Sequence, residues 1–537
     1  RRPGPAAALP RALSSGGAPS GGHEDEEREF HVLKKAHSIN SGVALSRGVS
    51  IGQEEREQKK KSTLKHSLIT GDVHGSYRTL QQVETWRKRP LFRRAGKNLT
   101  FSSGQEAAEL LVDEVRRRDP YQIDFLQAVQ ETSQDVSSMF EEAPKLAWVF
   151  KQLMEPERLL TFRVPWTDDN GNARINRGYR IQYSSALGHY HGGLRFHPQL
   201  SHGSIRMLGW EQTLKNAITG FPLGGSRGGS DFDPMYKSDA EIRRFCQSFM
   251  HELSDFVGAE VDTLETDLGV GKLEMASLED TFRELDDGAA AEEIDELFGA
   301  CEIFPEASGF GAVYFAERAV QAAFQTTLKD KVCLLSGSGT LARSIALKLV
   351  EKGAVPVTFS DETGYVYDEK GFTKGDIDNI AHIKAGSGTL KEYAKASHKK
   401  FAEAGTLWEQ VRGDIAFPCN IQGELNADDA TLLADNGCMA VFESSDRGCT
   451  PNAQEILEER QVLYAPGKLV NCGSVIASHQ VVGRSVEELN AILEERMPQI
   501  HDRVLETADK YGRPGSLRAG ANLYAFVRIA NSSMYVQ

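Results

Sequence analysis

The sequence lacks the features that would place it among membrane-spanning, disulfide-stabilised or zinc-binding proteins. No run of apolar residues approaches the roughly 18 that a membrane-spanning helix needs. The seven cysteines are odd in number and no two stand at CxxC spacing, which argues against a disulfide framework and a zinc site. With 40% apolar and 26% charged residues, the 537-residue chain is neither collagen-like nor mostly disordered. We expect two or three globular domains in a reducing compartment.

The first 22 residues contain no acidic residue and are rich in Ala, Ser, Pro and Gly, with three arginines. This composition is typical of an organellar transit peptide, and we predict that residues 1–22 are the remnant of one. The mitochondrion is the first choice of destination and the plastid the second. The alternative is a low-complexity linker with no targeting role.

Positive charge is concentrated in the segment that follows. The whole chain has a formal net charge of -14, yet residues 31–100 hold fifteen Lys and Arg residues against five acidic ones. Residues 23–103 show no sustained helical or strand periodicity, and few aromatic residues stand between the basic clusters. We therefore predict a basic N-terminal extension over 23–104 whose 31–100 part docks on a large protein assembly. Nucleic acid is the weaker alternative, because no nucleic-acid-binding module is recognisable.

From about residue 105 the sequence shows the patterns of a folded α/β protein. Helical periodicity dominates residues 105–155, and residues 159–184 alternate like two strands joined by a turn at 168–171. Residues 200–260 are predicted to form helices broken by a glycine-rich segment. Short apolar segments typical of buried strands then alternate with helices, at residues 331–335, 355–361, 414–418, 439–443 and 462–466. This alternation predicts a doubly wound parallel sheet.

A glycine-rich turn follows the first of these strands and opens a helix. It reads Gly337-Ser338-Gly339-Thr340-Leu341-Ala342, the GxGxxA pattern whose backbone and helix N-terminus receive the pyrophosphate of a dinucleotide. The next strand ends about twenty residues on, at Ser360 and Asp361. Asp361 would bond the ribose hydroxyl of NAD and repel the 2′-phosphate of NADP unless a neighbouring cation compensated. We expect residues 337–341, Ser360 and Asp361 to bind one of these two cofactors.

Eight further motifs point to one family: MEPERLLTFRVPWTDD (154–169), GGLRFHP (192–198), LGWEQTLKNAITGFPLGG (208–225), GGSDFDP (228–234), DLGVG (267–271), PEASGFG (305–311), APGK (465–468) and AGANLYAFVRIA (519–530). On these motifs the chain resembles the hexameric glutamate dehydrogenases, especially the small NADP-linked type. The resemblance implies a homo- or hetero-oligomer with two α/β domains. These are a substrate and oligomerisation domain (105–304) and a Rossmann-like dinucleotide-binding domain (305–480), followed by C-terminal helices (481–537) that return to the first domain.

The resemblance also implies a reaction, the reversible NAD(P)-dependent oxidation of glutamate to 2-oxoglutarate and ammonia. That chemistry needs cations that hold two carboxylates, a lysine of lowered pKa, and a carboxylate that shuttles protons. Matched to the family motifs, Asp267 is the shuttle carboxylate and Lys215 is a substrate lysine. Ser478 takes the place of the serine that contacts the substrate's side-chain carboxylate, and Val475 provides an apolar contact. Ser308 stands for a threonine in the cofactor-binding PEATG motif.

Other positions depart from the family pattern. The lysine that grips the distal carboxylate is His191 here, the catalytic lysine is Arg227, and an arginine that contacts a substrate carboxylate is Phe304. Further replacements are Thr340 for an Asn in the glycine turn, Leu264-Glu265-Thr266-Asp267 for PAGD, and Ser444-Ser445-Asp446 for the GAN near the nicotinamide. Arg227 matters most, because a guanidinium keeps its charge in proteins whereas a buried lysine can lose its own. We expect Arg227 to hold Asp267 in a bidentate salt bridge; an electrostatic clamp that permits slow turnover is the alternative.

Residues 279–302 add ten acidic side chains and one base, Arg283, where the family has a lysine- and glycine-rich loop beside the cofactor. Either a solvated pair of helices or a docking surface for a basic partner fits this composition. The acids would repel a dinucleotide's phosphates. Two outcomes therefore stay open: the chain still binds NAD or NADP, or it has lost that binding. The sequence predicts a catalytically impaired glutamate dehydrogenase-like subunit of an organellar assembly. The alternative is an active NAD(P)-dependent dehydrogenase of glutamate or a related amino acid.

Overall fold

The computed structural model describes residues 101–535, apart from residues 287, 289, 299–302, 387 and 404–406. The predictions for residues 1–22 and for 23–100 lie outside this part. The helices predicted for 105–155 are present as α5 (Gly104–Arg118), α6 (Ile123–Asp135), α7 (Ser137–Glu142) and α8 (Lys145–Leu153). Phe125 and Phe150 pack edge-on against Trp210 of α9 (His202–Thr219), with ring centroids 6.2 and 5.6 Å apart. This helical layer therefore covers α9.

The first part of the fold is a five-stranded sheet with the order β1-β2-β4-β3-β5. Its strands are β1 (Arg158–Thr167), β2 (Ala173–Ser184), β3 (Tyr190–Phe196), β4 (Gly225–Ser230) and β5 (Asp262–Thr266). β1 and β2 form the predicted hairpin, with Gly171 at φ 81 in its turn. As predicted, the glycine-rich segment interrupts the helices, but it also forms a strand, β4, that was not predicted. Glycine lets β4 approach β3, since a Cβ on Gly229 would lie 1.9 Å from the Arg195 carbonyl oxygen.

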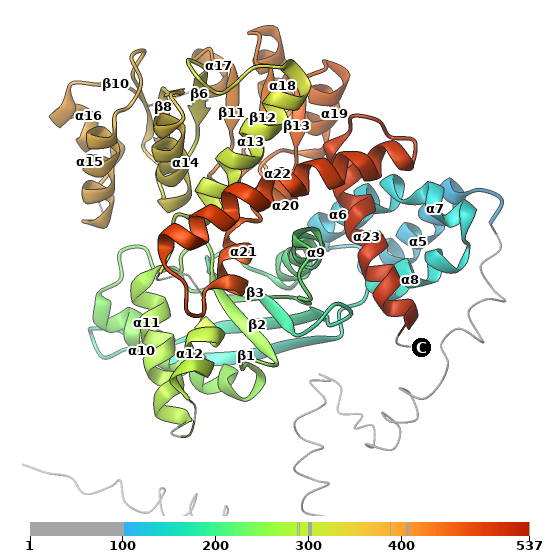
Figure 1. Ribbon diagram of the computed structural model, residues 1–537. Coiled ribbons are helices and arrows are strands. Elements are labelled where there is room, and N and C mark those ends of the chain that lie inside the picture. Colours follow the sequence, from blue (N-terminus) through green and yellow to red (C-terminus); the bar gives the residue numbers. More distant parts are fainter. Residues whose placement is uncertain are drawn as a thin grey trace, which may run out of the picture. The chain divides into compact units, whose positions relative to one another are not determined.

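Two layers cover this first sheet (Figure 1). Tyr179 and Ile181 of β2 belong to the core shared with α9, whereas Leu194 and Phe196 of β3 face a second core. That second core contains side chains of α10 (Asp239–Leu253), α11 (Lys272–Leu285) and α12 (Ala291–Phe298). The short 3-10 turn η1 (Ser254–Phe256) directly follows α10. Within the described residues, the acidic segment 279–302 is thus helical on both sides of its gaps, as predicted.

The second part is built on a sheet with the order β13-β12-β11-β6-β7, in which every pair is parallel. The doubly wound parallel sheet is therefore confirmed. The segment 355–361 was predicted as one strand but divides into β7 and β8, which belong to different sheets. Pro356 has no N–H group with which to continue the ladder. The strands are β6 (Val332–Leu335), β7 (Val355–Pro356), β8 (Thr358–Asp361), β9 (Gly364–Tyr367), β10 (Lys400–Ala402), β11 (Ile415–Phe417), β12 (Ala440–Phe442) and β13 (Leu463–Ala465).

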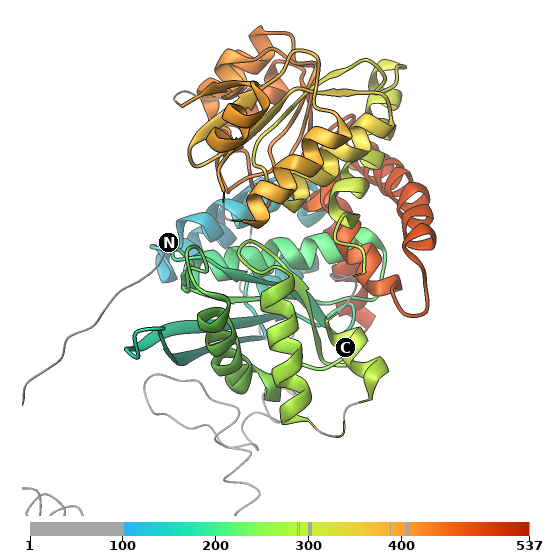
Figure 2. The same ribbon diagram turned by 90° about the vertical axis from the view of Figure 1, so that its left-hand side faces the viewer.

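Helices of the second part surround this sheet and lead back to the first (Figure 2). They are α13 (Ala307–Phe324), α14 (Thr340–Glu351), α15 (Lys374–Ala385), α16 (Leu390–Ser397), α17 (Leu407–Gln410), α18 (Ala427–Asp435), α19 (Pro451–Glu459), α20 (Gly467–Val470), α21 (Gly473–Gln480), α22 (Val486–Lys510) and α23 (Leu517–Tyr535). α22 packs along α13 of the second part, whereas α23 packs on α6, α8 and α9 of the first part. None of the described helices is both long and apolar enough to span a membrane.

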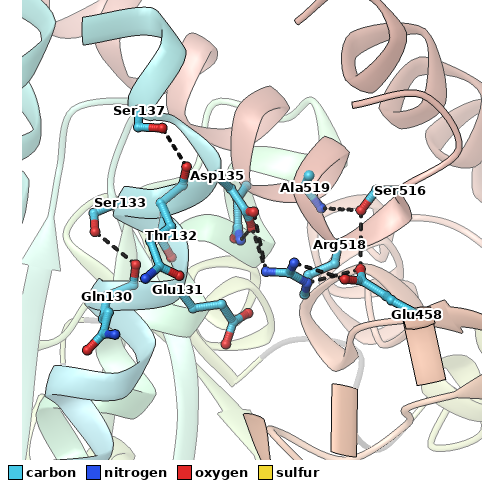
Figure 3. Close-up of polar contacts among 12 residues, drawn as sticks. Gln130, Glu131, Thr132, Ser133, Asp135, Ser137, Glu458, Ser516, Arg518 and Ala519 are labelled. Atoms are coloured by element: carbon cyan, nitrogen blue, oxygen red, sulfur yellow. Dashed lines mark hydrogen bonds and ion pairs between the residues drawn. The ribbon is translucent and has the colours of Figure 1, made fainter. Parts of the chain in front are cut away.

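Arg518, at the start of α23, ties the two parts together (Figure 3). Its Nη1 lies 3.1 Å from Oδ2 of Asp135 on α6, and its Nη2 lies 3.0 Å from Oε2 of Glu458 on α19. The amide of Asn522, one turn further along α23, donates to the same Asp135 oxygen at 2.7 Å. The C-terminal helix is thus fixed by buried polar contacts as well as by apolar packing.

Candidate active site

The strand order brings the predicted catalytic residues onto three neighbouring strands. Arg227 lies on β4, His191 is the second residue of β3, and Asp267 directly follows β5. β3 lies between β4 and β5 and pairs in parallel with both. Because alternate residues of a strand project to the same face, Arg195 lies on the same side of β3 as His191. This side faces α9, which carries Lys215.

Asp267 is held by two guanidinium groups. Arg195 binds it with two hydrogen bonds, Nε to Oδ2 at 2.6 Å and Nη2 to Oδ1 at 3.2 Å. Nη2 of Arg227 lies 2.7 Å from the same Oδ2. The predicted pair of Arg227 with Asp267 is present, but the bidentate partner is Arg195. Burial alone would raise the pKa of Asp267, yet the two cations hold that pKa well below its usual range.

Arg227 divides its donors among partners on several elements, which is why the bidentate prediction was wrong. Its Nη2 also lies 2.7 Å from Oδ2 of Asp446, which follows β12 in the second part. Its Nη1 donates to Gln212 of α9. Asp446 belongs to the segment that we expected near the nicotinamide. The Arg227 side chain is only 4% exposed, so its charge is balanced by these contacts and not by water.

The predicted substrate residues gather around a carboxylate of the chain itself, Glu265. The Ser478 hydroxyl donates to Oε1 of Glu265 at 3.0 Å, and Nε2 of His191 lies 3.2 Å from that oxygen. The other ring nitrogen of His191 lies 2.6 Å from the Thr263 hydroxyl. Burial alone would raise the pKa of Glu265, but His191, Lys215 and Ser478 together lower it to about 2. Glu265 is therefore ionised at neutral pH.

The other two positions matched to substrate contacts are apolar. Val475 is fully buried on α21, one turn before Ser478. Phe304 is 3% exposed, and its ring packs edge-on against Phe310 at 5.6 Å. This position therefore serves core packing and offers no charge to a ligand. Within the described residues Lys215 forms no ion pair with Asp267, whose cationic partners are Arg195 and Arg227.

The glycine-rich turn has the geometry that a pyrophosphate needs. Gly337 adopts φ 73, a left-handed conformation that favours glycine, and its N–H donates to the Ser360 hydroxyl at 2.8 Å. Gly339 caps α14 without any side-chain hydrogen bond, and a Cβ placed on it would meet nothing within 4 Å. The first N–H groups of α14 thus face open space, where an anion could accept their hydrogen bonds. The residues present fit a bound dinucleotide phosphate.

Neighbouring residues complete this end of the second part. Thr340 is the first residue of α14, Ser338 is buried in the turn, and Leu341 packs against the core. Arg343, which sequence reasoning did not single out, donates from Nη1 to the Ser338 carbonyl at 2.7 Å. Ser308 lies in the first turn of α13, whose close packing on α14 depends on Gly309.

Asp361 is already engaged within the second part. Its Oδ1 accepts hydrogen bonds from the backbone and hydroxyl of Thr363, at 2.9 and 2.6 Å. Its Oδ2 accepts from Lys384 Nζ at 2.9 Å and from the backbone of Leu390 at 2.7 Å. Burial alone would raise its pKa, but these bonds lower it. Lys384, 22% exposed, is a cation of the kind that would offset repulsion between Asp361 and a 2′-phosphate.

A cleft of about 500 Å³ opens beside the ion pairs. Residues of both parts line it, among them Gln127, Arg195, His197, Gln422 and Arg447. Arg195 is thus the residue through which the ion-paired cluster meets the cleft. Its place in the GGLRFHP motif and its alternation with His191 were visible in the sequence, and these signals could have identified it as a site residue. Glu265 was visible as a replacement, but its contacts were not.

Comparisons with known proteins identify the family and agree with the fold. Residues 156–284 match the family described as Glu/Leu/Phe/Val dehydrogenase, dimerisation domain, and residues 299–536 match Glutamate/Leucine/Phenylalanine/Valine dehydrogenase. The chain is 36% identical over 513 residues to an NADP-specific glutamate dehydrogenase of Chlorella sorokiniana, covering 93% of this chain and 96% of that protein. It is 38% identical to the corresponding Giardia intestinalis enzyme, covering 80% of this chain and 98% of that one.

Solved structures give the same result. A glutamate dehydrogenase of Plasmodium falciparum aligns with a TM-score of 0.76 at 34% identity, covering 81% of this chain and 95% of that one. Glutamate dehydrogenase 2 of the same organism aligns with a TM-score of 0.72 at 35% identity, covering 81% and 98%. The similarity therefore extends across both α/β parts and the C-terminal helices.

Proposed function

Because this chain belongs to the glutamate dehydrogenase family, we propose that it is a member with impaired catalysis that serves as a structural or regulatory subunit of a larger organellar assembly. The observation that carries the proposal is the position of Arg227, with Nη2 at 2.7 Å from both Asp267 and Asp446. A group that must release and recover a proton is replaced by one that keeps its charge.

The contacts around Arg227 weaken proton transfer at a second point. Asp267, matched to the shuttle carboxylate, accepts hydrogen bonds from Arg195 and lies against Arg227. To take up a proton it would have to give up much of its interaction with two cations, which its lowered pKa opposes. Both groups required for acid–base chemistry are thus occupied with each other.

We propose that the turn at 337–341 still holds the pyrophosphate of NAD(H) or NADP(H). When bound, the nicotinamide would supply the hydride acceptor or donor of the family reaction. The Ser360 hydroxyl positions the turn because it accepts a hydrogen bond from the Gly337 N–H. Arg343 places a cation in the first turn of α14. Asp361 and Lys384 form a neutral pair where the ribose would lie, and this arrangement is compatible with either cofactor.

The second candidate is an active NAD(P)-dependent dehydrogenase of glutamate or a related amino acid, with Arg227 as an electrostatic clamp. Two observations favour it: the open cleft beside Arg195 and the intact glycine turn. Similar proteins include NADP-specific enzymes and an NAD-specific glutamate dehydrogenase of Bacteroides fragilis, 37% identical over 443 residues. Their names suggest a nicotinamide cofactor for this chain.

The activity test uses purified full-length protein with NADH or NADPH, ammonia and a panel of 2-oxo acids that carry one or two carboxylates. We expect no cofactor oxidation by the wild type. Arg227→Lys should gain turnover of about tenfold or more, a change of about 1.4 kcal/mol in the barrier, because lysine can shed its proton. Arg227→Gln is the matched control, since it removes the charge without supplying an amine. Turnover by the wild type, or a lysine variant no faster than the glutamine variant, would contradict the proposal.

The assembly role rests on the basic residues 31–100 and on the family description of 156–284 as a dimerisation domain. We propose a homo- or hetero-oligomer that docks through the basic arm, in the mitochondrion or, as the second choice, in the plastid. Native mass measurement on protein purified from its source tests this. Co-purification with other polypeptides supports docking on an assembly, whereas a lone protomer or a homohexamer without any other polypeptide argues against that docking.

A further inference from the structure

Glu265 occupies a carboxylate receptor that is assembled from separate elements. His191 comes from β3, Lys215 from α9 and Ser478 from α21, and all three act on the Glu265 carboxylate at the end of β5. Glu265 itself is only 3% exposed. The Ser478 hydroxyl and the His191 ring reach the same oxygen of Glu265, at 3.0 and 3.2 Å, and Lys215 adds a positive charge that favours the ionised carboxylate. A hydroxyl donor together with cationic or ring N–H groups suits the binding of a carboxylate.

Glu265 also faces the reacting side of the site. Thr263, Glu265 and Asp267 alternate along β5 and its continuation, so their side chains project to the same face. The contact of His191 with Thr263 and Glu265 fixes this direction. Asp267 on that face reaches Arg195, which lines the cleft. The receptor therefore lies on the same face of β5 as Asp267, whose partner Arg195 lines the cleft, and it already holds a negative charge.

We propose that Glu265 is a built-in substitute for the side-chain carboxylate of a dicarboxylic substrate, so that this chain excludes dicarboxylates and any small ligand of the cleft carries a single carboxylate. The proposal rests on the proposed function, because the motif resemblance implies substrate contacts at Lys215 and Ser478. A free dicarboxylate would have to displace a tethered carboxylate whose local concentration is far higher than that of a free ligand.

The test is ligand binding by full-length protein, measured by calorimetry and thermal shift. The dicarboxylate probes are 2-oxoglutarate and glutarate, and the monocarboxylate controls are 2-oxobutyrate and butyrate. The wild type should show no saturable binding of either dicarboxylate. Glu265→Ala should bind dicarboxylates about tenfold or more tightly than the wild type does, without an equal gain for monocarboxylates. Adding Ser478→Ala to Glu265→Ala should reduce that gain, because Ser478 supplies a donor to the same carboxylate.

Asp135→Ala is the matched control, because Asp135 is a buried acid that pairs with Arg518 and Asn522 and does not line the cleft. It should lose stability without gaining dicarboxylate binding. If Glu265→Ala does not fold, Glu265→Ser removes the same carboxylate and retains a hydroxyl. Soluble recovery of that variant with glutarate but not butyrate in the lysis buffer supports the proposal, and equal recovery in both contradicts it.

The two proposals fail separately. Turnover of a monocarboxylic 2-oxo acid by the wild type would contradict impaired catalysis but not the role of Glu265. Saturable binding of 2-oxoglutarate to an inactive wild type, as tight as to Glu265→Ala, would overturn the role of Glu265 and leave impaired catalysis in place. An equal gain for butyrate in Glu265→Ala would show a general cavity and would also overturn it.

Discussion

Four ionised side chains near the cleft form a charge-balanced cluster. Arg195 and Arg227 supply two positive charges, and Asp267 and Asp446 supply two negative ones. Their side chains are 4% to 16% exposed, so water does little to stabilise them individually. Asp446 belongs to the second part of the fold and the other three to the first. The balance of charge therefore depends on the two parts staying together.

The contribution of this cluster to the free energy of unfolding can be measured by replacing one of its acids. Asp446→Asn leaves Arg227 and Arg195 with one shared carboxylate, and we expect the free energy of unfolding to fall by about 3 kcal/mol. Arg227→Gln in the same background should recover part of that loss, giving a coupling of at least about 1 kcal/mol in a urea-denaturation cycle. Asp435→Asn, which breaks the exposed pair with Arg460, should change stability by less than about 1 kcal/mol. Additive losses would refute the coupling.

Part of this site could be predicted from the sequence. The pairing of Arg227 with Asp267 was predictable, because a fixed cation replaces the residue that works beside that carboxylate. The sharing of Arg227 with Asp446 was not, since these residues are 219 positions apart and meet only through the arrangement of the two parts. The contacts of Glu265 likewise required the pairing of β3 with β5, which sets His191 opposite Thr263.

Secondary-structure elements were predicted where one physical signal dominated. The parallel strands β6, β11, β12 and β13 follow from short apolar segments, and α14 follows from the glycine turn before it. β4 was missed because glycine has a low strand propensity, and here it is required by the close approach of β3. The division of β7 from β8 at Pro356 depends on backbone pairing, which periodicity does not reveal.

At the scale of an element, a lysine on α15 allows the preference between NAD(H) and NADP(H) to be tested. Lys384, near its end, neutralises Asp361 at the end of β8. In Lys384→Ala the Asp361 carboxylate loses that cation and should repel a 2′-phosphate, so the thermal stabilisation by NADPH should fall while that by NADH is retained. Lys391→Ala, which breaks an exposed pair with Glu403 in the same region, is the control. Equal loss for both cofactors would contradict a selective role for Lys384.

Buried ion pairs join the two parts of the whole molecule at several points. Arg447, beside Asp446, lies 3.1 Å from Glu131 and 3.2 Å from Glu211. Lys468 lies 2.9 Å from the second oxygen of Glu211. Together with Arg518 and the Asp446 contacts, these pairs form a polar seam between the parts. Separating the two parts would break several of these pairs at once, so the pairs oppose that separation.

Arg518 offers the sharpest test of this seam. Arg518→Ala leaves Asp135, which is 2% exposed, with Asn522 but without its cation, and we expect a loss of about 3 kcal/mol in the free energy of unfolding. Arg460→Ala is the matched control, because it removes an arginine from an exposed pair and should cost less than about 1 kcal/mol. If the seam couples the two parts, thermal unfolding of Arg518→Ala should also separate into two transitions, whereas the control should keep the wild-type profile. A single transition with unchanged stability would show that apolar packing of α22 and α23 alone holds the parts together.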